Sequence, residues 1–368
     1  MAQVKMILVG GFLGAGKTTL LATAAGILAR RGVRVGLVTN DQATGLVDSE
    51  TLRSSSGNVS EVAGACFCCA FNRLLEVCEA LVNEQASQVL IGEPVGSCTD
   101  LSATVLQPIK KYCSALYKLA PYSVLVDPSR LMESIGGQPS ELADDVRYIY
   151  RKQIEEADLI VLNKADTITA QQREDLLTLL AREFPAVPVM CLSARSEDQV
   201  AQWLAHVTEG GLAGQRVVEV DYDVYARGEA ALGWLNATAE LVSRQPAEWD
   251  AIGRKLMDRL REGLTRLGAD TAHLKLLLET RQGQWVANLT ASAAEPSFRG
   301  QAGIGQQARL LINARVQTDP DSLRAMVEQA LAAATGQETT SPVAYKVTDL
   351  SCFSPARPNP VHRFGAVV

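Results

Sequence analysis

Apolar runs and amphipathic stretches alternate along the first 215 residues of the chain. The short apolar runs predict buried strands over 5–9, 33–39, 88–92, 122–127, 159–162 and 187–192. The stretches between them have helical spacing and predict helices over 17–31, 71–84, 101–112, 141–156 and 170–183. Strands that alternate with helices indicate the α/β class, with a mostly parallel sheet flanked by helices.

The pattern changes at a glycine-rich segment over 210–215, which predicts a linker. Beyond it, the sequence predicts strands over 216–222, 274–280, 284–290 and 308–316, and helices over 229–243, 246–267 (with Pro246 in the first turn) and 321–334. We therefore expect a first domain over 1–209, a smaller α+β domain over 216–335 and a proline-containing tail over 336–368. The tail is either a loosely packed end or a segment that docks on a partner or back onto the domain.

A phosphate-binding loop follows the first predicted strand. Gly11 is followed by four residues and then by Gly16-Lys17-Thr18, a spacing typical of P-loop NTPases. Glycines let backbone amides face phosphate oxygens, Lys17 would reach the β- and γ-phosphates, and the Thr18 hydroxyl would bind magnesium. A glycine-rich turn that happens to carry a lysine is the alternative. The candidate phosphate-binding residues are Gly11, Gly14, Ala15, Gly16, Lys17, Thr18 and Thr19.

A second motif, Asn-Lys-x-Asp at 163–166, favours guanine over adenine. The Asp166 carboxylate can accept hydrogen bonds from N1–H and the N2 amino group of guanine, whereas adenine lacks that pair of donors. Asn163 would brace the loop and Lys164 would cover the base. A second base-contacting loop is expected after the last strand of the first domain. The candidate base-contacting residues are Asn163, Lys164, Asp166, Ser193 and Ala194.

Three thiols lie within four residues, at Cys66, Cys68 and Cys69, in a chain with 8 cysteines among 368 residues. Thiolates bind zinc, copper(I) and cobalt well, and a short loop can direct several of them to one ion. A fourth ligand would come from elsewhere in the chain, from water or from a second chain. Buried apolar thiols and a redox pair are the alternatives.

The Gly-Phe-Leu-Gly-Ala-Gly-Lys-Thr-Thr loop, the Cys-x-Cys-Cys segment, the Glu-x-x-Gly at 93–96 and the Asn-Lys-x-Asp motif occur in this order. Together they resemble the CobW/HypB/UreG GTPases, and specifically their CobW-like branch. The resemblance covers about residues 4–205. It implies a P-loop GTPase fold, and GTP hydrolysis coupled to the handling of a metal or a metal-containing cofactor.

The resemblance also implies roles for individual residues. Lys17, Asp41 and Glu93 would be the catalytic residues. Thr18 and Glu93 would hold magnesium, with Glu93 acting through water. Asp41, favoured over Asp48, would complete the magnesium shell or orient the attacking water. The Gly96 amide would lie near the γ-phosphate, which makes residues 93–105 a switch that senses that phosphate.

This switch departs from the Glu-Thr-Ser-Gly pattern of the family. Pro94-Val95 replaces Thr-Ser, and Cys98 follows closely. A proline stiffens the backbone, while Cys98 is either a small buried residue or a further thiol ligand. No arginine finger can be assigned from the sequence, so intrinsic hydrolysis is expected to be slow.

Composition narrows the class of protein. The formal net charge is −6 and the isoelectric point is about 5.3, so nucleic-acid binding has no electrostatic support. The uncharged stretch from Met6 to Gly16 is too short to cross a bilayer and lacks a cleavage pattern, so neither a membrane span nor a signal peptide is expected. The cysteine content fits a reducing, cytoplasmic environment better than a disulfide framework.

These observations predict a slow GTPase that acts as a metallochaperone. Its expected cofactors are GTP, magnesium and a transition metal, either zinc or cobalt. Its expected partners are a client metalloenzyme or cofactor-assembly protein and, in a nucleotide-dependent manner, a second copy of the chain. One alternative is a GTP-dependent gatekeeper of a cobalamin- or corrinoid-dependent enzyme that binds no metal itself. The other is a small-molecule kinase or ATPase, against which Asp166 argues.

Overall fold

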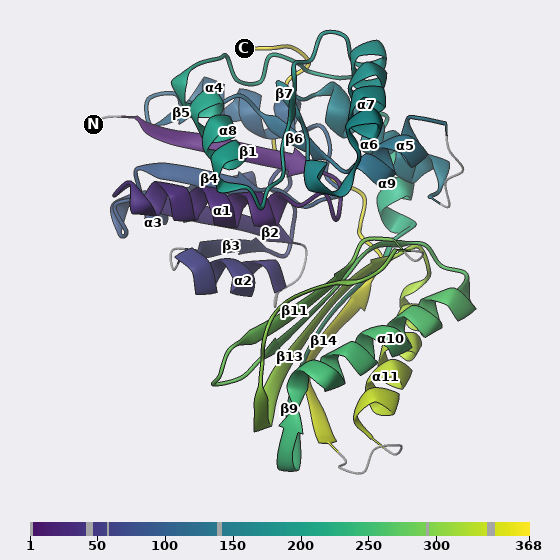
Figure 1. Cartoon of the computed structure of the whole chain (residues 1–368). Coiled ribbons are helices and arrows are strands. Elements are labelled where there is room, and N and C mark those ends of the chain that lie inside the picture. The colour runs from purple at the N-terminus through teal and green to yellow at the C-terminus, as the bar shows by residue number, and fades with distance from the viewer. Residues whose placement is uncertain (1–2, 42–46, 57–58, 138–141, 292–293, 337–342) are drawn as a thin grey trace. The chain divides into compact units, whose positions relative to one another are not determined.

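The chain forms two β-sheets, one parallel and one antiparallel (Figure 1). The computed structural model describes residues 3–41, 47–56, 59–137, 142–291, 294–336 and 343–368. The first unit contains the described residues up to 41 together with 48–228 and 357–368. The second unit contains Val47 and the described residues between 229 and 356.

The sheet of the first unit has the strand order β3-β2-β4-β1-β6-β7-β8. The short strand β5 pairs with the first part of β1, and β6 pairs with its last part. Every pairing among its described strands is parallel, which confirms the α/β class. The strands are β1 (Val4–Gly11), β2 (Val35–Asp41), β3 (Val59–Ala63), β4 (Val89–Glu93), β5 (Tyr117–Leu119), β6 (Ser123–Val126), β7 (Leu159–Leu162) and β8 (Val189–Cys191).

Helices connect these strands, as the sequence pattern predicts. Within the described residues they are α1 (Lys17–Arg30), α2 (Val47–Ser56), α3 (Phe71–Asn83), the π-helical turn η1 (Ser102–Leu106), α4 (Gln107–Tyr112), α5 (Pro128–Ser134), α6 (Asp144–Glu155), the 3₁₀ turn η2 (Ala165–Thr167), α7 (Ala170–Glu183), α8 (Glu197–Glu209) and α9 (Tyr222–Ala230). Helix α7 begins where predicted because Thr169 and Gln172 form a reciprocal capping box. None of the described helices is long and apolar enough to cross a bilayer.

One hydrophobic core packs the central strands of the first unit against helices α1 and α8. Ile7 of β1, Ile91 of β4 and Val161 of β7 are fully buried and belong to one cluster with apolar residues of α1 and α8. Trp203 of α8 is also fully buried, and its indole N–H donates to the Ser123 hydroxyl at 3.0 Å. Because parallel strands all point the same way, the loops after β1, β4 and β7 emerge at one edge of the sheet.

The second unit is built on an antiparallel sheet with the order β12-β11-β10-β13-β9-β14. Helices α10 (Trp249–Leu267) and α11 (Pro320–Thr335) lie beside this sheet (Figure 1). This arrangement confirms the predicted smaller α+β domain. Its strands are β9 (Gly233–Glu248), β10 (Thr271–Glu279), β11 (Gln284–Leu289), β12 (Ser297–Gly300), β13 (Ile304–Val316) and β14 (Val343–Phe353).

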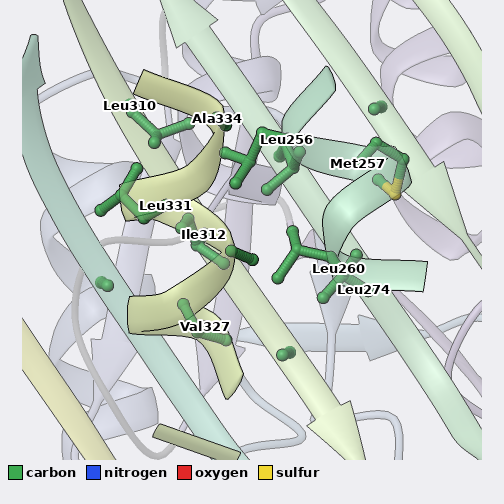
Figure 2. Close-up of a cluster of buried hydrophobic side chains, with 14 of the residues drawn as sticks. Leu256, Met257, Leu260, Leu274, Leu310, Ile312, Val327, Leu331 and Ala334 are labelled. Atoms are coloured by element: carbon green, nitrogen blue, oxygen red, sulfur yellow. The ribbon is translucent and has the colours of Figure 1, made fainter. Parts of the chain in front are cut away.

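Apolar side chains from both helices and the sheet form the core of the second unit. Leu260 of α10, Val327 of α11 and Ile312 of β13 are nearly or fully buried in one cluster (Figure 2). The apolar face of each helix is covered by the sheet, so this unit has a core of its own, separate from that of the first unit.

Two predicted elements in the second half of the chain are wrong. The segment 216–222 contains no strand, and α9 begins at its last residue. Most of the helix predicted over 229–243 is instead strand: α9 ends at Ala230 and β9 begins at Gly233, with Ala237, Ala239 and Leu241 buried at every second position. Alanine, glutamate and leucine favour helices locally, but burial against the sheet decides the structure of this segment.

Pro246 lies in β9 and not in the first turn of α10. The pairing of β9 with β13 passes from Val242–Gln307 to Ala247–Gly305, so the residues between 242 and 247 form a bulge. A proline is tolerated there because a bulge leaves an unpaired residue that needs no ladder hydrogen bond.

Candidate nucleotide and metal site

The loop between β1 and α1 has the backbone of a phosphate cradle. Gly11, Gly14 and Gly16 all have positive φ angles, of 124°, 79° and 96°. Gly16 begins α1 without a side-chain cap. A Cβ atom at Gly16 would lie 2.4 Å from the Asn163 amide nitrogen, so only glycine fits. The amides of the first turn of α1 can therefore face an anion.

Lys17, Thr18 and Glu93 lie together at this loop. The Lys17 ammonium is buried and donates to the carbonyl oxygens of Gly11 at 2.9 Å and Phe12 at 3.2 Å. It also lies 3.8 Å from the Glu93 carboxylate. The Thr18 hydroxyl donates to the same carboxylate at 3.2 Å. A hydroxyl and a carboxylate beside a phosphate loop form the oxygen-rich donor set that magnesium prefers.

Asn163 joins the loops that are expected to hold the base. Its amide donates to the Ala15 carbonyl at 2.7 Å, and its side-chain oxygen accepts from the Ala194 N–H at 2.8 Å. Lys164 adopts a left-handed φ of 58°, and its ammonium lies 2.6 Å from the Asp127 carboxylate. Asp166 is exposed, so its carboxylate is accessible to a base. Ser193 is buried, and its N–H donates to Gln199 at 2.6 Å.

The three clustered thiols lie at the turn that leads into α3. Their sulfur atoms are all within 4.8 Å of one another, the separation expected of ligands to one ion. Cys66 and Cys68 are buried with their sulfurs 2.8 Å apart, and the sulfurs of Cys68 and Cys69 are 3.8 Å apart. The turn is closed by the N–H groups of Cys69 and Ala70, which donate to the Cys66 carbonyl at 3.0 and 2.8 Å.

The family model for the CobW/HypB/UreG nucleotide-binding domain matches residues 5–190, which include the phosphate loop, the thiols and the Asn-Lys-x-Asp motif. The chain belongs to the CobW/HypB/UreG family. The resemblance seen in the sequence motifs is thereby confirmed.

Relatives of this CobW/HypB/UreG chain include the zinc chaperone CobW of Pseudomonas aeruginosa. The two are 26% identical over an alignment of 224 residues, and the match covers 54% of this chain and 58% of that protein. Among solved structures, HypB from Helicobacter pylori in complex with nickel is 19% identical, with a TM-score of 0.41 over 56% of this chain and 86% of that one. The Zn(II)-bound YjiA GTPase from E. coli is 16% identical, with a TM-score of 0.35 over 90% and 99%.

Within this CobW/HypB/UreG domain, Asn40 links β2 to the thiol turn. Its amide nitrogen donates to the carbonyls of Val62 at 2.8 Å and Ala65 at 2.7 Å, and its oxygen accepts from the Phe67 N–H at 2.8 Å. Asp41, the next residue, ends β2. Its side chain and residues 42–46 lie outside the part of the chain that the structure describes. No motif in the sequence marks Asn40 for this role, because its partners lie 22 to 27 positions away.

The three clustered thiols differ in pKa. Hydrogen bonds with Cys68 first, and then with Cys69 and Cys98, hold the pKa of Cys66 well below its usual value. The same contact with Cys66 raises the pKa of Cys68 well above its usual value, and raises that of Cys69 to about 11. Of the three, Cys66 is the thiol whose surroundings most favour the thiolate form. A thiolate is the form that binds metal.

The segment after β4 packs against the phosphate loop. A Cβ atom at Gly96 would lie 2.7 Å from the Leu13 side chain, so the backbone approaches the loop closely. The Gln153 amide of α6 donates to the carbonyls of Gly96 at 2.9 Å and Cys98 at 2.8 Å. Gln153 therefore holds the segment that the resemblance identifies as a switch.

Residues 357–368 return to the first unit and contact both the thiol turn and the switch. The Asn359 N–H donates to the Cys69 sulfur at 3.2 Å, and the Val361 N–H donates to the Cys68 carbonyl at 2.9 Å. The Arg363 guanidinium donates to the Asp100 carboxylate at 2.7 Å. Of the alternatives for the tail, the structure has the one in which it docks back onto the chain.

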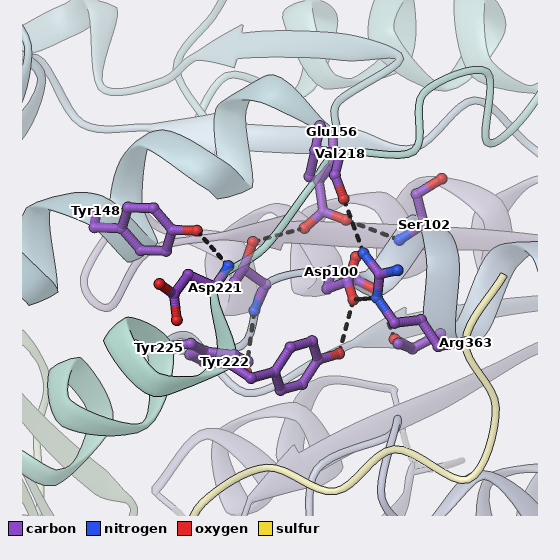
Figure 3. A network of polar contacts seen from close by, with 11 residues as sticks. Asp100, Ser102, Tyr148, Glu156, Val218, Asp221, Tyr222, Tyr225 and Arg363 are labelled. Carbon is purple, nitrogen blue, oxygen red and sulfur yellow. Dashed lines mark hydrogen bonds and ion pairs between the residues drawn. The ribbon is translucent and has the colours of Figure 1, made fainter. Parts of the chain in front are cut away.

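A buried acidic network surrounds Asp100 (Figure 3). Its carboxylate also accepts from the Tyr222 hydroxyl at 2.7 Å. Glu156 is fully buried and accepts from the Ser102 N–H at 2.8 Å and the Thr99 hydroxyl at 3.3 Å. Burial raises the pKa of Asp100, and it raises that of Glu156 well above its usual value. This network joins positions too far apart in the sequence for a motif to reveal them.

Replacing Glu156 with glutamine is expected to stabilise the protein at neutral and higher pH. Because the folded-state pKa of Glu156 is raised, its contribution to stability is fully present below the unfolded-state pKa and is lost as the pH rises toward the folded-state pKa. Glutamine keeps an oxygen for the Ser102 N–H without a charge. Urea unfolding should show the variant to be more stable than wild type at about pH 8 and closer to it at about pH 4.5. A variant less stable at both pH values would contradict this account.

Proposed function

We propose that this chain is a GTP-hydrolysing metallochaperone that binds a transition metal through Cys66, Cys68 and Cys69 and releases it to a client under nucleotide control. The observation that carries the proposal is the Asn40 side chain, which binds the thiol turn to the end of β2. That strand ends at Asp41, a proposed magnesium ligand. A change at the nucleotide can therefore reach the thiols through one side chain.

The proposed nucleotide is GTP with magnesium. Gly11, Gly14, Ala15, Gly16, Lys17, Thr18 and Thr19 would hold the phosphates, with Gly96 near the γ-phosphate. Thr18, Glu93 and Asp41 would hold magnesium, which supplies positive charge at the phosphates when bound. Lys17 would neutralise charge on the transferred phosphoryl group, and Asp41 would orient the attacking water. Hydrolysis would be slow unless a partner or second protomer completes the site.

The proposed cargo is zinc, with cobalt as the second choice. Buried thiolates are soft ligands that suit zinc and can hold cobalt. The 26% identical relative is named a zinc chaperone, which supports the same choice. The client would be a metalloenzyme or a cofactor-assembly protein in the cytoplasm, and GTP could bring two copies of the chain together.

Replacing Asp166 with asparagine is expected to change the base preference from guanine to xanthine. Asparagine can donate to the xanthine O2 and accept from its N1–H, whereas it cannot accept both hydrogen bonds that guanine donates. Affinity for GTP should fall by about 100-fold and affinity for XTP should rise, since a mismatched polar group is left unpaired. Binding of fluorescent GTP and XTP analogues measures both affinities.

An exposed acidic residue of the next helix serves as the control for Asp166. Asp175 of α7 lies outside the motif, so its replacement with asparagine should leave both affinities unchanged. Equal loss of GTP binding in the two variants, or preference of the wild type for ATP, would contradict guanine recognition by Asp166.

Titration with cobalt(II) tests the metal site. With magnesium and a GTP analogue present, one equivalent of cobalt should produce thiolate-to-metal charge-transfer absorption. The absorption should disappear in a Cys66→Ala, Cys68→Ala, Cys69→Ala triple variant. Intact GTP hydrolysis without metal binding by the wild type would favour the gatekeeper of a cobalamin- or corrinoid-dependent enzyme instead.

A further inference from the structure

Residues 359–364 of the tail belong to the first unit and hold the thiol turn by two backbone donors. The Asn359 N–H donates to the Cys69 sulfur at 3.2 Å, and the Val361 N–H donates to the Cys68 carbonyl at 2.9 Å. One proline precedes Asn359 and another follows it. Because proline fixes φ, the undocked tail has fewer conformations to lose, which lowers the entropic cost of these contacts.

The same residues hold the switch segment, 93–105, at their other end. The Arg363 guanidinium donates to the Asp100 carboxylate at 2.7 Å (Figure 3), and the Phe364 N–H donates to the Ala103 carbonyl at 3.0 Å. Asp100 is buried, and Arg363 supplies a positive charge beside it. The Asp100 backbone is left-handed, with a φ of 64°, a conformation that persists only where the surrounding structure holds it. The tail therefore stabilises a strained point of the switch segment.

Between these two ends, the His362 ring touches one helix from each side of the connection. Its centroid lies 5.2 Å from that of Phe71, the first residue of α3, and 5.3 Å from that of Tyr112, the last residue of α4. Helix α3 directly follows the thiol turn, and α4 continues from the switch segment through η1. The contacts of residues 359–364 are therefore continuous from the thiols to the switch segment.

We propose that residues 359–364 form a strap that transmits the state of the switch segment to the thiol turn, with Arg363 as its positioning residue. The inference rests on the proposed function and adds a second route beside that of Asn40. With GTP bound, Asp100 stays paired with Arg363, and the Asn359 N–H stays on a metal-ligating sulfur, where such a donor strengthens metal binding. Movement of the switch segment after hydrolysis separates that ion pair, releases the strap and weakens the hold on zinc.

The test is the ratio of zinc affinities with a GTP analogue and with GDP, each with magnesium, measured by competition with a chromophoric chelator. The wild-type ratio should be at least about 10, and Arg363→Ala should lower it to below about 3. A merely structural role would lower both affinities and leave the ratio unchanged. Arg363→Lys, which keeps a positive charge near Asp100, should recover part of the ratio.

The thiol end of the strap provides an independent variant. Asn359→Pro removes the N–H that the Cys69 sulfur accepts. It should lower zinc affinity in the GTP-analogue state by about 10-fold, the usual effect of losing a donor to a metal ligand, and should lower the ratio as well. This variant decides the question if thermal unfolding shows that Arg363→Ala is poorly folded.

Arg357 provides the matched control, because it precedes the strap and forms an exposed ion pair with Asp223 of α9. Exposed ion pairs contribute little to stability. Arg357→Ala should therefore keep both the zinc affinity and the ratio of the wild type.

The outcomes separate the two proposals. A wild-type ratio that persists in well-folded Arg363→Ala and Asn359→Pro would overturn the strap and leave the nucleotide-controlled chaperone standing. Loss of the ratio in Arg357→Ala to the same extent as in Arg363→Ala would also overturn the strap, because it would show a nonspecific effect of changing the tail. A wild type that binds no zinc would overturn both the strap and the proposed function.

Discussion

Replacing Cys66 with alanine is expected to lower the zinc affinity of the protein by at least about 1,000-fold, which corresponds to about 4 kcal/mol. Hydrogen bonds with Cys68, Cys69 and Cys98 hold the pKa of Cys66 well below its usual value, which favours the thiolate form that binds metal. Its loss removes a charged ligand and also the partner that the Cys68 thiol contacts at 2.8 Å. Competition with a chromophoric zinc chelator measures the change.

A thiol outside the cluster provides the control for this loss of zinc affinity. Cys191 is half-buried at the end of β8 and belongs to no thiol group in the described part of the chain. Cys191→Ala should therefore bind zinc as the wild type does. Retention of wild-type zinc affinity in Cys66→Ala would show that the metal binds elsewhere or that the thiols are a redox or packing feature.

Replacing Lys17 with alanine is expected to lower the rate of GTP hydrolysis by at least about 100-fold, the effect of removing one preorganised charge donor. The Lys17 ammonium is held at the phosphate loop by the carbonyls of Gly11 and Phe12 and lies 3.8 Å from Glu93. It is thus positioned to exchange those contacts for phosphate oxygens. Phosphate release under saturating GTP and magnesium measures the rate.

The control for Lys17 is an exposed lysine of the first unit that lies outside the phosphate loop. Lys118 of β5 is exposed, so Lys118→Ala should hydrolyse GTP at the wild-type rate. A Lys17→Ala protein that folds normally and keeps more than about half of the wild-type rate would contradict the assignment of this loop to phosphate binding and catalysis.

The fold of the first unit could be predicted from the sequence because its elements are local and regular. Strands buried on both faces appear as apolar runs, as in β7 (Leu159–Leu162), and the capping box at Thr169 marks the start of α7. The second unit was harder to predict. Its long strand β9 contains helix-favouring residues, which hide the alternation of its buried positions. Strand β14 lies at the edge of the sheet with a single buried side chain, so it shows no clear alternation.

The candidate site was predictable where its residues form continuous motifs. The phosphate loop, the Asn-Lys-x-Asp motif and the three clustered thiols could be located by spacing alone. The contacts that join these motifs could not. The pair formed by Asp100 and Arg363 spans 263 positions, and that formed by Asn163 and Ala15 spans 148. Such contacts depend on strand order and on the docking of the tail, which spacing does not encode.

The central claim is that the nucleotide controls metal affinity. The most direct test measures the zinc affinity of the wild-type protein with magnesium and a non-hydrolysable GTP analogue, and again with magnesium and GDP. The account predicts that zinc binds at least about 10-fold more tightly with the GTP analogue, a coupling within the usual range for linked sites. Equal zinc affinity in the two nucleotide states would contradict it.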